Sequence, residues 1–242
     1  MSRGQQKQAA RSSQGSSISA RTMAIALALV VLVAGCALAV MQLTSNDSKP
    51  AALEGVADAR DLLAGIPVNG DTIGKPSATA LITEFGDLRC PNCRAYAESE
   101  TPKVIAQLVR TGKARLRLRI WPILGPDSTA AGRAAYAASR QGKLWSFATV
   151  WYANQRSEGE TYATPSFFDP IASAVGIDAG RFKSDRTSSA ADAWLTATST
   201  MALAAGFSGT PTFVVEGPKG RVAATASIPN ADGLAKLVAK LS

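Results

Sequence analysis

The longest apolar run of the chain extends from Met23 to Met41 and contains no charged or strongly polar side chain. As a helix this run would span roughly 28 Å, close to the roughly 30 Å hydrocarbon core of a bilayer. A helix of that length in a soluble core would keep a polar face, and this segment has none. The pattern therefore predicts a single transmembrane anchor over residues 23–43.

The segment before the apolar run, residues 1–22, carries basic side chains and no acidic ones. Its other residues are mainly Ser, Gln, Ala and Gly, a composition that predicts a disordered tail. Positive charge tends to remain on the cytoplasmic side of a span. We therefore expect a single-pass protein of the cell membrane, with a cytoplasmic N-terminus and an extracytoplasmic C-terminal domain.

Two other interpretations of the apolar run remain open. A cleaved signal peptide would have a shorter apolar core than this one. The sequence from Val33 to Cys36 resembles a lipoprotein signal, in which Cys36 would carry a lipid, although apolar residues continue past Cys36 to Met41. All three interpretations place the folded part of the chain outside the cytoplasm.

After the apolar run, residues 44–64 are predicted to form a linker with a short amphipathic helix that stops at Gly65. Turn residues follow, and the run Ala78–Phe85 is apolar and rich in β-branched side chains. Its turn-bounded pattern predicts a buried strand. Residues Ala114–Ile120 alternate between apolar residues and arginines, which predicts a second strand whose arginine face is solvated or covered by a helix.

The remaining pattern is mostly helical. Cys90–Leu108 is predicted to be a helix that Pro102 interrupts. Residues 128–205 are helical in character, with predicted breaks at Gly142, Pro165, Pro170 and Gly180. A strand at Thr212–Val215, a hairpin into Val222–Ala226 and a helix over Ala231–Leu241 complete the chain. This order predicts an α/β fold with a mixed sheet and a helical insertion.

The net charge of +8 does not indicate a nucleic-acid partner. Four of the 26 basic residues and none of the 18 acidic ones lie in residues 1–22, so the rest of the chain carries only +4. No cluster of basic and aromatic residues resembles a single-strand binding surface. We expect an ordinary, mildly basic surface.

The cysteines carry the chemistry. Of the three, Cys36 lies in the apolar run, and the other two form the motif Cys90-Pro91-Asn92-Cys93. A pair this close encloses too short a loop to stabilise a fold by cross-linking. A structural zinc site needs four ligands, and the chain has no histidine and no second pair. The pair is therefore predicted to be a redox-active dithiol, without metal or cofactor.

The position of the motif predicts which cysteine is the reactive thiol and which is the resolving thiol. A strand, a turn and a helix start place Cys90 where unpaired amides and the helix dipole favour a thiolate. We expect Arg89 and Arg94 to add positive charge near Cys90 and Asp87 to oppose it. A lowered pKa would make Cys90 a good leaving group and favour donation of the disulfide. Cys93, one turn into the helix, would be the buried resolving thiol.

These motifs together resemble the DsbA-type thioredoxin-fold proteins. The matching residues are Thr83-Glu84-Phe85-Gly86-Asp87, then the Cys90–Cys93 motif, then Gly209-Thr210-Pro211-Thr212-Phe213 before a hairpin and a terminal helix. The resemblance covers residues 65–242. It implies a thioredoxin-like domain with a helical insertion at about 127–205.

The resemblance also implies roles for other residues. Pro211 would be a cis-proline that faces the dithiol, and the backbone of Thr210 would bind a client polypeptide. Glu84 would be a buried acid beneath the dithiol that assists proton transfer, although it could instead be a partly exposed residue at a strand end. Pro91 and Asn92 would tune the dithiol. Partners would be folding exported proteins with free cysteines and a quinone-linked membrane reoxidase.

One departure from the family pattern leaves the direction of electron flow open. The best-known oxidases of this type carry histidine between the cysteines, where this chain has Asn92. An amide supplies no positive charge, so the disulfide would be less oxidising. A disulfide oxidase is the first hypothesis. The alternatives are a dedicated reductase or an isomerase, or a membrane-tethered binding or chaperone module that uses the same groove without turnover.

Overall fold

The computed structural model describes residues 25, 29, 32–33, 52–224 and 227–242. The chain divides into two units, residues 1–52 and residues 53–242. In the first unit, residues 25, 29, 32 and 33 are helical, Ala52 has no regular secondary structure, and all five are exposed. The rest of the predicted tail and anchor, including Cys36, lies outside the described residues. Among the residues that are described, no helix combines the length and the apolar character needed to cross a bilayer.

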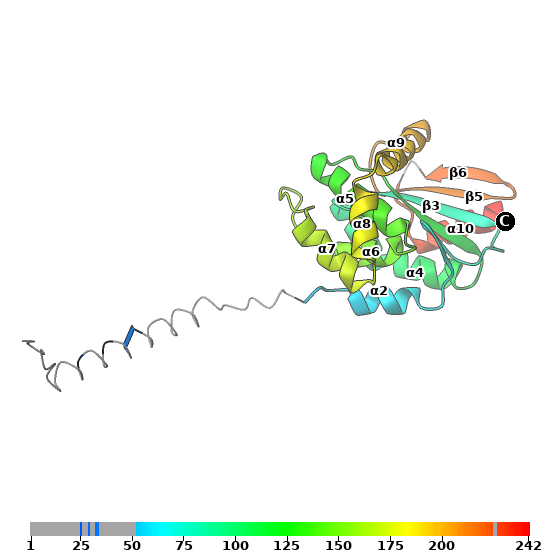
Figure 1. The fold of residues 1–242 in the computed structure, drawn as a ribbon. Helices are drawn as coiled ribbons and strands as arrows, with labels where there is room; N and C mark the ends of the chain where they lie inside the picture. The colour runs from blue at the N-terminus through cyan, green and yellow to red at the C-terminus, as the bar shows by residue number, and fades with distance from the viewer. Residues whose placement is uncertain (1–24, 26–28, 30–31, 34–51, 225–226) are drawn as a thin grey trace, which may run out of the picture. The chain divides into compact units, whose positions relative to one another are not determined.

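The second unit is built on a mixed sheet of six strands in the order β1-β2-β4-β3-β5-β6 (Figure 1). Strands β3 and β4 are parallel, and every other neighbouring pair is antiparallel. The strands are β1 (Val68–Asn69), β2 (Thr72–Ile73), β3 (Ala80–Gly86), β4 (Ala114–Ile120), β5 (Thr212–Gly217) and β6 (Gly220–Ala224). The predicted mixed sheet is confirmed, whereas the two-residue strands β1 and β2 were not predicted.

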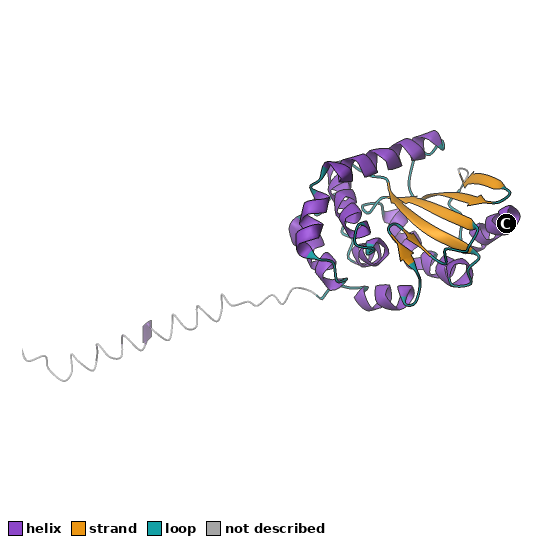
Figure 2. Cartoon of the chain, turned by 45° about the vertical axis from the view of Figure 1, so that its right-hand side comes forward, coloured by secondary structure: helices purple, strands orange, loops and turns teal. Residues whose placement is uncertain are grey.

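Helices cover the sheet on both faces (Figure 2). They are α2 (Val56–Leu63), α3 (Pro91–Ser99), α4 (Thr101–Val104), the π-helical turn η1 (Ile105–Val109), α5 (Pro126–Ser139), α6 (Leu144–Ala153), α7 (Pro165–Ala174), α8 (Ala179–Arg186), α9 (Ser189–Ala204) and α10 (Ala231–Leu241). Helices α5 to α9 form the insertion between β4 and β5.

The two sheet faces bury different clusters. On one face, Ile82, Leu116 and Val215 belong to the main core, which α10 and η1 help to cover. On the other face, Phe85 and Val214 form a smaller cluster with residues at the end of α9. Strand β3 lies between both clusters, so all seven of its residues are buried. This double burial explains the unbroken apolar run that predicted the strand.

Two of the four predicted helix breaks are correct. Gly142 has φ 67° between α5 and α6, and Pro165 begins α7. The break at Pro170 is wrong, because Pro170 lies on the exposed side of α7 while its neighbours bury two phenylalanines. The break at Gly180 is also wrong. It lies in the first turn of α8, whose start is capped by Asp178.

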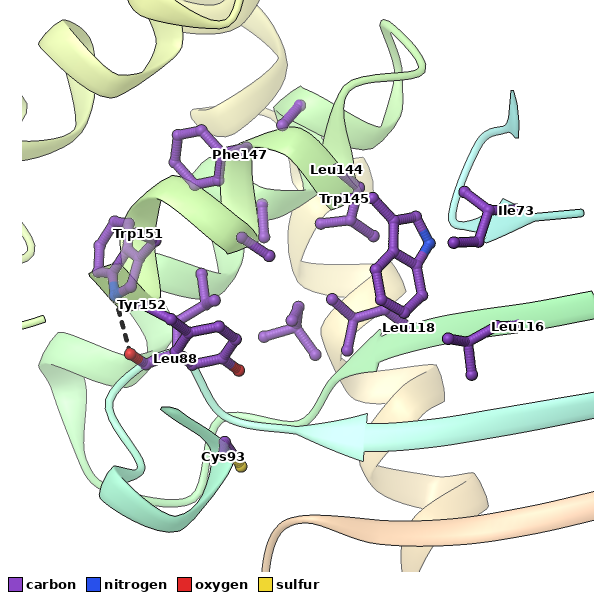
Figure 3. Packing of buried hydrophobic residues seen from close by; sticks show 14 of the residues in the cluster. Ile73, Leu88, Cys93, Leu116, Leu118, Leu144, Trp145, Phe147, Trp151 and Tyr152 are labelled. Atoms are coloured by element: carbon purple, nitrogen blue, oxygen red, sulfur yellow. Dashed lines mark hydrogen bonds between the residues drawn. The ribbon is translucent and has the colours of Figure 1, made fainter. Parts of the chain in front are cut away.

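Helix α6 forms the centre of the core beside the sheet (Figure 3). Its sequence LWSFATVWYA buries seven of ten residues, among them Phe147, Trp151 and Tyr152. Helix α2 packs on α6 and contributes Val56 and Leu63 to the core. This helix was expected within a linker, and the compact unit that begins at Leu53 includes it.

Candidate active site

The Cys90–Cys93 pair lies after β3, at the start of α3, as predicted. Strand β3 ends at Gly86, a short loop follows, and α3 begins at Pro91, which occupies the first turn. Cys90 is the N-cap of α3, and its sulfur accepts a hydrogen bond from the amide of Cys93 at 3.4 Å. A sulfur thus occupies the position where a helix offers unpaired amide donors.

The two sulfurs have different surroundings. Cys90 keeps 6% of its surface exposed, whereas Cys93 is completely buried. Figure 3 shows Cys93 beneath Tyr152 and Leu88, inside the main core. The amide of Asp87 donates to the Cys93 sulfur at 3.5 Å. Of the two sulfurs, Cys90 is therefore the one within reach of an incoming thiol.

The pKa of the Cys90 thiol is lowered from 9.0 to about 6. The largest cause is a hydrogen bond with the Cys93 side chain, which outweighs the opposing effect of burial. Smaller contributions come from Thr210 and from the backbone amides of Cys93 and Asn92. Burial raises the pKa of Cys93 well above its ordinary value. At neutral pH, Cys90 is therefore mainly a thiolate and Cys93 a thiol.

The two arginines beside the motif do not supply the charge that was expected of them. Arg89 turns away into the helical insertion, where its buried guanidinium forms an ion pair with the partly buried Asp127. Arg94 pairs with Glu98 at 2.8 Å. Each guanidinium has its own carboxylate, and neither is among the causes that lower the pKa of Cys90.

Residues 210 and 211 lie opposite the dithiol, although 120 residues separate Thr210 from Cys90 along the chain. The Thr210–Pro211 peptide bond is cis, and the Cys90 sulfur lies 3.4 Å from the Thr210 carbonyl oxygen, to which it can donate only in its thiol form. A hollow of about 240 Å³ adjoins this loop, lined among others by Phe207, Thr212 and Ile228. The predicted proximity of Cys90, Thr210 and Pro211 is thus present.

Glu84 is buried, and the alternative of a partly exposed strand-end residue is wrong. Its relative exposure is 3%, and it pairs in register with Leu118 on β4 and Phe213 on β5. Burial raises the pKa of the Glu84 carboxyl to about 8. A carboxyl with such a pKa exchanges its proton near neutral pH.

Asp87 was expected to oppose a thiolate at Cys90, and its main contacts were not foreseen. Its carboxylate accepts hydrogen bonds from the amides of Arg89, Ile123 and Leu124 and from the hydroxyl of Ser128. These donors belong to three separate segments of the chain. The sequence shows only an aspartate after a strand, which gives no sign of these partners.

The end of α6 also holds the active-site loop, and no sequence signal distinguished it from ordinary core. Trp151 donates from its indole nitrogen to the carbonyl of Leu88 at 2.8 Å, as Figure 3 shows. The side-chain amide of Gln155 donates to the carbonyls of Leu88 at 2.8 Å and Cys90 at 3.2 Å. The helical insertion therefore shapes the loop that presents Cys90.

Asn92 is exposed at the helix start, and Pro91 beside it is exposed as well. Neither carries charge. Across the ranges that the structure describes, no group of three or more His, Cys, Asp or Glu side chains is arranged to hold a metal ion. The arrangement can perform thiol–disulfide exchange with its own side chains, since that reaction needs only two sulfurs and proton transfer.

Comparison with known proteins agrees with this geometry. A family model described as thioredoxin matches residues 68–227. A probable disulfide bond formation protein D of Bacillus cereus is 30% identical over 119 residues, which cover 47% of this chain and 55% of that protein. The chain thus spans about half the length of this curated relative.

Two solved structures share the fold. A thioredoxin-like oxidoreductase from Silicibacter pomeroyi is 30% identical, with a TM-score of 0.56, over 75% of this chain and 96% of that one. DsbA of Chlamydia trachomatis is 21% identical, with a TM-score of 0.61, over 71% of this chain and 90% of that one. With a family model that matches more than half of its length, this chain belongs to the thioredoxin family.

Proposed function

We propose that the protein is an extracytoplasmic thiol–disulfide oxidoreductase that donates disulfides to exported proteins with free cysteines. The arrangement of Cys90 and Cys93 carries this proposal. Cys90 caps α3 and accepts the Cys93 amide, while Cys93 is buried behind it. A stabilised Cys90 thiolate favours the reduced dithiol, and a protein whose reduced form is stabilised gives its disulfide away.

The reaction proceeds in two exchanges. A client thiolate attacks the Cys90 sulfur of the oxidised protein, the Cys90–Cys93 bond breaks, and its electron pair leaves on Cys93, which takes a proton. A second client thiolate then attacks the client sulfur of the mixed disulfide and expels Cys90 as a thiolate. The client loses two electrons and gains a disulfide, and the protein becomes a dithiol.

Glu84 and the Thr210–Pro211 peptide take supporting roles in this scheme. Glu84 is buried with a pKa of about 8, so it can give and take the proton that Cys93 exchanges. Thr210 and Pro211 lie against Cys90. Their backbone would align the client segment that carries the attacking cysteine, and Pro91 and Asn92 would border its path.

The location and the redox partner belong to the same proposal. Residues 23–43 would anchor the protein in the cell membrane with its folded unit outside, where a quinone-linked membrane reoxidase would restore the disulfide. The observations in support are the apolar run and the basic segment before it. External protease added to intact cells should digest the folded unit. Intact mass after membrane extraction would show whether Cys36 carries a lipid.

A dedicated extracytoplasmic reductase is the second candidate, and Asn92 is the observation that favours it. Asn92 is exposed beside the dithiol and carries no charge. A neutral side chain there leaves stabilisation of the Cys90 thiolate to hydrogen bonds alone, which would lower the oxidising strength of the disulfide.

The reduction potential of the Cys90–Cys93 disulfide tests the proposal. We would equilibrate the full chain, in detergent, against glutathione and follow the ratio of disulfide to dithiol. A potential well above about −200 mV supports a disulfide donor, and one near about −270 mV makes the reductase the better description. In cells, Cys93→Ser should trap clients as mixed disulfides on Cys90. Full function of Cys90→Ser would instead support a binding module without turnover.

A further inference from the structure

Asp87 has a buried carboxylate that the exchange chemistry does not use. Its residue exposure is 0%. The carboxylate accepts from the amides of Arg89 at 2.8 Å, Ile123 at 2.8 Å and Leu124 at 3.2 Å, and from the Ser128 hydroxyl at 2.9 Å. Four hydrogen bonds to one buried carboxylate fix its position more firmly than packing alone would.

The main chain of Asp87 is held at the same time. Its carbonyl accepts from the amide of Cys90 at 3.0 Å and from the hydroxyl of Tyr152 at 3.3 Å. Its own amide is the group that donates to the Cys93 sulfur, at 3.5 Å. Contacts on the side chain and on the carbonyl therefore fix the direction of one amide, and that amide points to the resolving cysteine.

We infer that Asp87 is a positioning residue, whose carboxylate holds its own amide on the Cys93 sulfur for the step in which Cys93 carries negative charge. This inference rests on the proposed exchange reaction. In that step an attacking thiolate bonds to Cys90, the Cys90–Cys93 bond breaks, and the electron pair passes to Cys93. The amide of Asp87 donates to the sulfur that receives this charge.

The need for such a donor follows from the surroundings of Cys93. Its sulfur is buried, and burial raises the pKa of its thiol well above the ordinary value. A buried anion without donors is costly to form. A fixed donor lowers that cost in the transition state, as donors do at other sites of developing negative charge.

The proposed role of Asp87 affects the rate of disulfide exchange but not its equilibrium. At neutral pH Cys93 is protonated in the reduced protein, so its thiolate exists only in passing. Loss of a donor to that thiolate slows the exchange but leaves the energies of the disulfide and of the final dithiol almost unchanged. A purely structural role for Asp87 would affect unfolding without this separation.

The experiment uses the full chain in detergent, oxidised, with dithiothreitol as the attacking thiol. Asp87→Asn keeps the size of the side chain but turns an amide group toward the donors at Ile123 and Leu124. We expect the second-order rate of reduction to fall about tenfold, the effect of losing one hydrogen bond to a charged group. The reduction potential against glutathione should stay within about threefold in the equilibrium constant.

Whether Asp87→Asn slows or speeds the reduction distinguishes the loss of the donor from the loss of the charge. Asp87→Asn removes a negative charge close to both sulfurs, and that change alone favours thiolates and would speed the reaction. A slower reaction therefore cannot come from the lost charge. An unchanged or faster reaction in the folded variant, or a potential that shifts by the same factor as the rate, would overturn the inference.

Ser128→Ala keeps the inference testable if Asp87→Asn does not fold. It removes one of the four donors, preserves the charge, and should slow reduction about threefold. Ser139→Ala is its matched control, since Ser139 is also buried on α5 but donates to the carbonyl of Tyr136. We expect no rate change there. Equal rates in the two variants would count against a role for the Asp87 network.

The test needs no client, so its outcome is independent of the direction of electron flow. A potential near that of thioredoxin would end the oxidase proposal and leave the role of Asp87 intact. A normal rate in Asp87→Asn would end the role of Asp87 and leave the oxidase proposal intact.

Discussion

Cys93 controls the acidity of its neighbour, because its side chain is the largest cause of the low pKa of Cys90. Cys93→Ala removes that hydrogen bond, and we expect the pKa of Cys90 to rise from about 6 toward its ordinary value. Cys93→Ser keeps a hydroxyl donor and should keep the pKa low. The ultraviolet absorbance of the thiolate, followed against pH, measures both. Equal pKa values in the two variants would contradict this account.

The low pKa of Cys90 also makes the stability of the reduced protein depend on pH. The pKa is about 6 in the folded protein and near 9.0 in an unfolded chain. A depressed pKa stabilises the fold above the unfolded value, and this contribution is lost as pH falls through the folded value. We expect urea unfolding to show the loss between about pH 9 and pH 6. Cys90→Ser should lack this part of the pH dependence.

The raised pKa of Glu84 has the opposite effect on the pH dependence of stability. Its folded pKa of about 8 lies above the ordinary 4.5, so the fold loses stability as pH rises from 4.5 toward 8. Glu84→Gln removes the ionisation and should raise the free energy of unfolding at pH 8 by on the order of 2–4 kcal/mol, with little change at pH 4. Urea unfolding at the two pH values measures this. Glu98→Gln, on exposed α3 surface, is the control and should show no such difference.

At the residue scale, the reactive cysteines could be predicted from the sequence. The hydrogen bonds that hold the residues around them in place could not. The spacing of Cys90 and Cys93, and the place of Glu84 in a buried strand, follow from local patterns. The contacts of Asp87 do not, because its donors Ile123, Leu124 and Ser128 lie 36 to 41 residues away. Only the folded insertion brings those donors to the carboxylate.

At the element scale, the loop that follows α6 depends on one part-buried ion pair. Arg89 binds Asp127 and the carbonyls of Glu158 and Glu160, and its guanidinium lies 4.4 Å from the ring centre of Tyr162. Asp127 in turn accepts the amides of Tyr162 and Ala163. The loop is thus tied both to the residue before Cys90 and to the first turn of α5.

We expect Arg89→Met to destabilise the protein by about 3 kcal/mol, because the partly buried carboxylate of Asp127 loses its charged partner and keeps only two amide donors. The double variant Arg89→Met with Asp127→Leu should recover much of that loss. Urea unfolding at pH 7 measures both. Arg94→Met breaks the exposed pair with Glu98 and should cost no more than about 1 kcal/mol. A double variant as unstable as Arg89→Met would argue against the ion pair as the cause.

Periodicity predicted the elements that bury a regular pattern. Strand β4 and helix α10 have the predicted ends, and β3 differs from its prediction by one or two residues. Strands β1 and β2 were missed because two residues cannot display an alternation. Pro170 shows the converse, since the burial of Phe167 and Phe168 maintains α7 across a residue that disfavours helix.

At the scale of the whole molecule, α2 belongs to the folded unit. Val56, Leu62 and Leu63 pack against the main core. We expect residues 53–242 to unfold in a single transition with the stability of the full chain. Residues 65–242, which lack α2, should be less stable by about 2–4 kcal/mol, because apolar surface on α6 loses its cover. Urea unfolding compares the two, and equal stabilities would show that α2 contributes little.

The order of elements predicted an α/β fold with an insertion, whereas the placement of the insertion could not be read from the sequence. No local pattern states that Trp151 and Gln155 would lie against the carbonyl of Leu88. Those contacts join segments more than 60 residues apart. They depend on how α6 packs against the sheet, which is a property of the assembled core.

The distance along the chain between Cys90 and Thr210 has a consequence for biosynthesis. Cys90 leaves the ribosome 120 residues before Thr210 does, and β5 pairs with β3 only after that. During this interval the nascent dithiol lacks the opposing peptide. If the protein acts on clients as proposed, recognition would begin only once the C-terminal strands have been added. A prematurely terminated chain would then carry the cysteines without the peptide that faces them.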